Sequence, residues 1–150
     1  MIAENNSPDA GDAQSDEPDA AQRPTVLVVE DDPDFRRMLT TTISLRFGYR
    51  VLVATDGRTA VSTASTEQPD LILMDMAMPH LNGVAATELL KQDAATRSIP
   101  IIAFSNYARI ATWRNKALDA GVTRCLDKAI RMDELEQVIA DVLREASAKS

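Results

Sequence analysis

The chain has 150 residues, a length that one hydrophobic core can serve, since chains divide into domains only when a core outgrows roughly 250 to 300 residues. Hydrophobic residues make up 45% of the chain, charged residues make up 26%, and the formal net charge is −7, which excludes a fibrous or wholly disordered protein. No apolar stretch approaches the ~20 residues of a membrane helix, and the first residues lack a secretory signal, so we expect a cytoplasmic protein without membrane contact.

The charge is unevenly distributed along the chain. Residues 1–24 contain six acidic residues, one basic residue and three prolines, and their one large aliphatic residue is Ile2. Such a segment cannot bury enough apolar surface to offset its ordering entropy, so we predict a disordered acidic tail over residues 1–23. We expect it to act as a solubilising extension, with docking of a basic partner as the alternative. The rest of the chain has no dense basic stripe, so direct DNA binding is not expected.

From residue 24 onward, short apolar runs that predict strands alternate with stretches whose apolar residues recur at helical spacing. In chain order, the pattern predicts a strand at 25–29, a helix at 35–47, a strand at 50–54, a helix at 58–67, a strand at 71–74, a helix at 84–93, a strand at 99–104, a helix at 109–120, a strand at 122–126 and a closing helix at 135–143. This alternation predicts an α/β fold, a doubly wound five-stranded parallel sheet with helices on both faces. We expect one domain over residues 24–146 and a short C-terminal tail over residues 147–150.

Polar side chains stand where the predicted strands end. Glu30, Asp31 and Asp32 follow the first strand, Asp75 the third, Ser105 the fourth, and Asp127 and Lys128 the fifth. Because the carboxyl ends of parallel strands meet at one edge, where such folds bind their ligands, we expect these side chains to converge. Each of them alone also has a plainer interpretation, as the cap of the next helix or as a solvated side chain.

Three of these side chains, Glu30, Asp31 and Asp75, are carboxylates that would repel one another unless a cation lies among them. Mg²⁺ suits such a site, because it binds through one or two carboxylates and keeps positions open for phosphate oxygens. A single cysteine and a single histidine exclude a zinc cluster. With Lys128 and Ser105 opposite, the site would hold a nucleophile, a metal, a fixed positive charge and a hydroxyl, which are the parts that phosphoryl transfer requires.

The sequence resembles the response-regulator receiver domain of two-component signalling, a family with a flavodoxin-like fold. The likeness covers about residues 24–146 and is carried by Val28 to Asp32, by Asp70 to Pro79 with Gly83, and by the pair Asp127-Lys128. It implies that Asp75 is the phosphoacceptor and receives its phosphoryl group from a sensor histidine kinase or a histidine phosphotransfer protein.

The resemblance also implies the roles of the other site residues. Asp31, Asp75 and the backbone carbonyl of Ala77 would contact Mg²⁺ directly, and Glu30 would act through water. Lys128 would pair with the phosphoryl oxygens, and Ser105 would turn toward the phosphate and draw the following loop inward. A downstream protein partner would then bind the face formed by the fourth helix, the fifth strand and the fifth helix.

Two positions depart from the family pattern. Ala129 follows the lysine where the family usually has proline, and Cys125 replaces the usual switch aromatic, so we expect the signal to leave through Ser105 and the loop at 106–107. We interpret Cys125 as a small buried residue rather than a redox group. Two aromatic residues have two interpretations each. Tyr107 would either shield the pocket or pack on the surface, and Trp113 would either anchor the fold or contact a partner. We interpret His80 as an ordinary loop residue.

We expect a stand-alone receiver that works as a phosphorylation-dependent interaction switch. It would not be an enzyme beyond catalysing its own phosphorylation and dephosphorylation. One alternative is a receiver that binds its partner without phosphorylation, for which the missing proline and switch aromatic are the support. Another is a phosphatase with Asp75 as nucleophile, but the haloacid-dehalogenase type needs a second acid where Ala77 stands.

Overall fold

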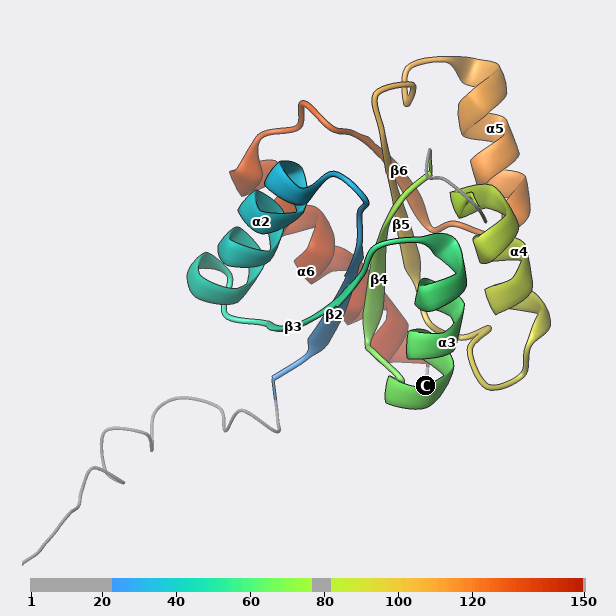
Figure 1. Cartoon of the computed structure of the whole chain (residues 1–150), viewed down its shortest axis with the longest axis horizontal. Coiled ribbons are helices and arrows are strands. Elements are labelled where there is room, and N and C mark those ends of the chain that lie inside the picture. The colour runs from blue at the N-terminus through green and yellow to red at the C-terminus, as the bar shows by residue number, and fades with distance from the viewer. Residues whose placement is uncertain (1–22, 77–81, 150) are drawn as a thin grey trace, which may run out of the picture.

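A five-stranded parallel sheet forms the centre of the computed structural model, which describes residues 23–76 and 82–149 (Figure 1). The strands are β2 (Thr25–Val29), β3 (Arg50–Ala54), β4 (Leu71–Asp75), β5 (Ile101–Ser105) and β6 (Arg124–Asp127). Their order across the sheet is β3-β2-β4-β5-β6, and every neighbouring pair is parallel. The chain first moves outward from β2 to β3 and then returns past β2 to β4, so the order reverses between β2 and β4. This arrangement confirms the predicted doubly wound sheet.

Helices cover both faces of the sheet (Figure 1). One face carries α2 (Pro33–Thr41), its π-helical continuation η3 (Thr42–Arg46) and α6 (Met132–Lys149), and the other carries α3 (Gly57–Glu67), α4 (Gly83–Gln92) and α5 (Ala111–Ala120). Each strand therefore buries side chains in two directions. In β2, Val26 and Val28 pack toward α2 and α6, whereas Leu27 and Val29 belong to the core beneath α3 and α4. This two-sided burial explains the uninterrupted apolar runs of the sequence.

The helix ends differ most from the sequence prediction. The first helix begins at Pro33 because the carboxylate of Asp32 caps it, accepting a hydrogen bond from the backbone N–H of Phe35 at 2.9 Å. The other four helix starts also shift by one to three residues, and α5 begins only at Ala111 after a turn. The closing helix is longer than its apolar stripe predicts, because the residues after that stripe include no glycine or proline that would end a helix. It reaches Lys149 and so includes most of residues 147–150, where we expected a C-terminal tail.

Some expectations concern residues that the structure does not describe. The predicted acidic tail lies outside the described residues apart from Arg23, and so do Ala77 and His80. Among the helices within residues 23–76 and 82–149, none combines the length and the apolarity that crossing a membrane would require.

We predict that two leucines contribute very differently to stability. Leu73 lies in the central strand β4 with 1% of its surface exposed, whereas Leu45 in η3 is 81% exposed. Leu73→Ala should lower the free energy of unfolding by about 2 to 5 kcal/mol, because it leaves a cavity in the core. Leu45→Ala should change it by less than about 0.5 kcal/mol. Urea unfolding of both variants checks this, and equal losses would contradict the layered core described above.

Candidate functional site

Acidic and basic side chains meet at the carboxyl ends of the strands. Glu30 directly follows β2, Asp75 is the last residue of β4, and Lys128 directly follows β6. One carboxylate oxygen from each of Glu30, Asp31 and Asp75 lies within 4.8 Å of the others. Strands far apart in the sequence thus place three acids at the point where the strand order reverses, which is where doubly wound folds bind their ligands.

Lys128 compensates the two buried acids of this cluster. Its Nζ lies 3.0 Å from Oε1 of Glu30 and 3.3 Å from Oδ2 of Asp75. Glu30 is 1% and Asp75 4% exposed, and the Lys128 side chain is 18% exposed, so all three ionic groups are largely withdrawn from water. Two charges held in so little water attract each other more strongly than a surface pair does.

The backbone around Lys128 is fixed by hydrogen bonds. Its N–H donates to the carbonyl of Ser105 at 3.1 Å, and the N–H of Ala129 donates to Oδ1 of Asp127 at 2.8 Å. The N–H of Ile130 donates to the Asp127 carbonyl at 3.0 Å and closes the turn. Asp127 therefore holds the turn after β6, in which Ala129 stands where the family usually has proline.

The surroundings of the cluster shift two pKa values. Burial raises the pKa of Glu30 from 4.5 to about 7, and the nearby Asp75 carboxylate acts in the same direction, against the Asp32 N–H and Lys128. Burial alone would lower the pKa of Lys128, but its hydrogen bond to Glu30 and the charges of both acids outweigh burial and raise it. Lys128 therefore keeps its charge at neutral pH, and a further cation close to Glu30 would favour the ionised form of that acid.

The three carboxylates fit a divalent metal ion. Oε2 of Glu30 accepts a hydrogen bond from the Asp32 N–H at 3.1 Å. Its buried Oε1 faces Lys128 in the ion pair and has no other polar partner in the described part of the chain. Asp31 is exposed and so can reach an ion at the mouth of the cluster. A site made only of carboxylate oxygens suits a hard cation such as Mg²⁺.

Ser105 connects this edge to the loop that precedes α5. It ends β5 with 1% of its surface exposed, and its hydroxyl accepts a hydrogen bond from the Tyr107 N–H at 2.9 Å. Tyr107 itself is 52% exposed, which favours the surface position over the shielding one. A hollow beside Lys128 is lined by Asp32, Phe35, Asn106, Lys128 and Ala129.

Cys125 and Trp113 belong to the core layer beneath α3, α4 and α5. Both are partly buried and pack against that layer. Burial raises the pKa of the Cys125 thiol, although Arg114 opposes the shift, and its sulfur lies 3.9 Å from the Arg114 carbonyl. A thiol with a raised pKa forms little of the reactive thiolate, so the buried interpretation of Cys125 fits better than a redox one. The packing of Trp113 shows its anchoring role and leaves part of the indole accessible.

Sequence reasoning assigned no site role to Phe35, Arg36 or Gly83. The Arg36 guanidinium donates to the carbonyls of Glu30 at 3.1 Å and Asp31 at 3.3 Å. At Gly83, a Cβ would meet the Asp75 carbonyl oxygen at 2.7 Å and the Met76 Cα at 2.6 Å, so only glycine fits there without a shift. The sequence offered Asp32 as a possible helix cap and Gly83 as part of the family motif, but no feature of the sequence signals the contacts of Phe35 and Arg36 with other parts of the site.

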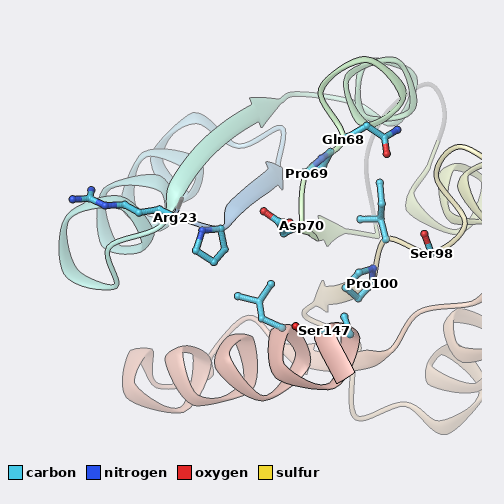
Figure 2. A pocket seen from close by; sticks show the side chains of 11 residues that line it. Arg23, Gln68, Pro69, Asp70, Ser98, Pro100 and Ser147 are labelled. Carbon is cyan, nitrogen blue, oxygen red and sulfur yellow. The ribbon is translucent and has the colours of Figure 1, made fainter. Parts of the chain in front are cut away.

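A second hollow, of about 580 Å³, lies at the opposite edge of the sheet (Figure 2). Asp70, Pro100 and Ser147 are among the residues around it. Oδ2 of Asp70 accepts a hydrogen bond from the Thr25 N–H at 2.7 Å, so this carboxylate already has a backbone partner. The described residues that line this hollow include no cluster of acids or bases comparable to that around Lys128, which makes the carboxyl edge the candidate site despite its smaller cavity.

Known proteins resemble this chain over most of its length. A family model described as the response regulator receiver domain matches residues 26–140. The probable transcriptional regulator ycf27 of Porphyridium aerugineum is 32% identical over 129 residues, which are 86% of this chain and 52% of that protein. Protein PilH of Pseudomonas aeruginosa is 43% identical over 77 residues, which are 51% of this chain and 63% of that protein. The chain thus spans about half to somewhat under two thirds of the length of these two relatives.

A solved structure shows a comparable fold with a metal ion. It is the receiver domain of the sensor histidine kinase PA1611 from Pseudomonas aeruginosa PAO1, with a magnesium ion coordinated in its active site cleft. Its TM-score is 0.75 at 31% identity, and the match covers 81% of this chain and 98% of that one. The acidic cluster of Glu30, Asp31 and Asp75 agrees with a site that can hold Mg²⁺.

We predict that the three consecutive acids affect magnesium binding unequally. Asp31→Ala should weaken Mg²⁺ binding most, because the exposed carboxylate is expected to contact the ion directly. Glu30→Ala should weaken Mg²⁺ binding less, by about tenfold, as expected of a group that acts through water. Asp32→Ala is the matched control, since its carboxylate caps α2 and should affect stability rather than affinity. Calorimetric titration with MgCl₂ measures all three, and equal losses for Asp31 and Glu30 would reject this division.

Proposed function

The chain belongs to the family of response regulator receiver domains, and we propose that it accepts a phosphoryl group on Asp75 and signals through a phosphorylation-dependent contact with another protein. One observation carries the proposal. Asp75 lies at the centre of the carboxyl edge, with the Lys128 ammonium 3.3 Å from Oδ2 and two further acids close by. A structural salt bridge with Lys128 would need only one acid. The two further carboxylates carry negative charge that Lys128 alone does not balance, and a cation bound by them could in turn bind a phosphoryl group.

In the proposed reaction, a carboxylate oxygen of Asp75 attacks the phosphorus of a phosphohistidine. The new P–O bond makes an acyl phosphate, the P–N bond breaks, and the donor imidazole keeps the electron pair of that bond and takes up a proton. The donor would be a sensor histidine kinase or a histidine phosphotransfer protein. Because Asp75 of the chain would itself receive the phosphoryl group, we propose no enzymatic role beyond the chain's own phosphorylation and dephosphorylation.

The other residues of the site neutralise and position charge. Asp31, Asp75 and the carbonyl of Ala77 would hold Mg²⁺ directly, and Glu30 would hold it through water. The bound ion would supply positive charge to the phosphoryl oxygens. Lys128, whose pKa is raised, would offer a second positive charge from the opposite side.

Ser105 would convert phosphorylation into a change of shape. Its hydroxyl now accepts the Tyr107 N–H, so turning toward a phosphoryl oxygen would exchange that hydrogen bond and release the loop. The loop is also tied to β6, since Nε of Arg109 lies 3.4 Å from Oδ2 of Asp127. Its movement would alter the face made by α5, β6 and α6, where Ile110 and Leu118 are exposed. We propose that a downstream protein binds this face, in the cytoplasm and without direct DNA contact.

We predict a magnesium-dependent, hydroxylamine-labile acyl phosphate on Asp75. Incubation with MgCl₂ and acetyl phosphate should add one phosphoryl mass to the intact chain. Asp75→Asn should abolish the addition, because an amide cannot form the acyl phosphate. Asp119→Asn, which changes an exposed acid on α5, should leave the addition unchanged. Phosphate on Asp75→Asn, or none on the wild type with a competent donor, would refute the proposal.

We predict that Ser105 is needed for the response and not for the chemistry. Ser105→Ala should still gain phosphate on Asp75, but phosphorylation should no longer change Trp113 fluorescence or amide exchange across residues 106–116. One charge-assisted hydrogen bond contributes about 1.5 to 3 kcal/mol, enough to shift a two-state loop about tenfold or more. Ser105→Thr keeps the hydroxyl and should restore the response. A full response in Ser105→Ala would place the switch in another element.

A further inference from the structure

The Lys128 ammonium has a third partner that carries no charge. Its Nζ lies over the ring of Phe35, 4.9 Å from the ring centroid. A cation within about 6 Å of the centroid, above the face of an aromatic ring, is attracted by the negative face of the π system. The attraction strengthens when water is excluded, and the Lys128 side chain is only 18% exposed.

Phe35 is held through both its backbone and its ring. Its backbone N–H donates to the Asp32 carboxylate, which fixes the residue in the first turn of α2. Its ring packs against the ring of Phe104, with 6.0 Å between centroids and 60° between planes, a tilted arrangement that aromatic pairs prefer. Phe104 lies in β5 and is 1% exposed. The ring therefore offers the lysine a fixed surface rather than a mobile one.

The three partners of Lys128 come from three different elements. Glu30 approaches from the end of β2, Asp75 from the end of β4, and Phe35 from α2. Both acids carry negative charge that other cations at this edge would share, whereas the ring binds the ammonium independently of them. A lysine has a long and flexible side chain, so a contact that persists when the carboxylates acquire new partners limits where its ammonium can lie.

We propose that Phe35 is a positioning residue, which holds the Lys128 ammonium beside Asp75 through a cation–π contact so that the charge is in place when the phosphoryl group arrives. This inference rests on the proposed function, and it adds to the site a residue whose effect on the rate of phosphorylation is exerted through the Lys128 ammonium. Phe35 then affects the rate of phosphorylation through Lys128.

The test varies the electron density of the ring while its shape stays nearly constant. In the full chain, Phe35 is replaced by nonsense suppression with phenylalanine and with its mono-, di- and trifluorinated analogues. The rate of phosphorylation by acetyl phosphate in saturating MgCl₂ should fall stepwise with fluorination, by about twofold to tenfold across the series. The same series at Phe47, which packs in the core at the end of η3, is the matched control and should be flat.

A second measurement reads the contact without phosphorylation. The Cε protons of Lys128 should show an upfield ring-current shift in the NMR spectrum, absent from the exposed Lys149. Phe35→Leu should remove the shift and slow phosphorylation about twofold to tenfold, whereas Phe35→Tyr should restore both. Magnesium affinity should not change in either variant, because neither alters a carboxylate.

The outcomes separate this inference from the function on which it rests. A graded series at Phe35, a flat one at Phe47 and a shifted Lys128 signal would support it. A flat series at Phe35, an equally steep series at Phe47, or an unshifted Lys128 signal in a chain that does gain phosphate would overturn the positioning role alone. A wild-type chain that gains no phosphate would instead overturn the proposed function and the positioning role with it.

Discussion

The buried ion pairs of Lys128 are the interaction on which the carboxyl edge depends. Glu30 and Asp75 are both almost fully buried, and placing two acids side by side in such surroundings is unfavourable unless a compensating charge lies close to them. Lys128 supplies that charge from the far side of β5, so β2, β4 and β6 are tied together at their ends by electrostatics as well as by the ladder. The two ion pairs offset the unfavourable free energy of burying the acids, and they also fix the positions of the three side chains relative to one another.

The layers of the fold serve this edge by fixing where each strand stops. Apolar side chains on both faces set the position of every strand along its own axis, and the parallel register brings the strand ends to the same edge. Asp75 pairs with Phe104 and Ser105 with Asp127, so the buried acid of β4, the ring that packs against Phe35 and the serine occupy adjacent rows. Since a shift of one residue would send each side chain to the other face, the hydrophobic core and the polar edge specify the same register.

The strands and their polar ends could be read from the sequence because both signals are local. An apolar run predicts a buried strand, and a parallel sheet gathers strand ends whatever the loops between them do. Three features could not be predicted because they depend on distances between separate elements. The depth at which Glu30 is buried, the approach of Phe35 to Lys128 and the hydrogen bond from Tyr107 to Ser105 are set by packing rather than by periodicity. The π-helical turn after Thr41 was missed for a related reason, since a helix pattern does not report which carbonyl each N–H selects.

The hollow at the opposite edge brings Arg23 and Ser147 to one place, although they stand near the two ends of the described fold (Figure 2). Both ends of the folded unit therefore lie on the side opposite the cluster of Glu30, Asp31 and Asp75. A unit built in this way can be inserted into a longer polypeptide, or joined to neighbours before and after it, with its carboxyl edge left uncovered. Modularity of this kind is a geometric property of the sheet, because the last parallel strand ends at the carboxyl edge and the closing helix α6 returns the chain to the edge from which it started.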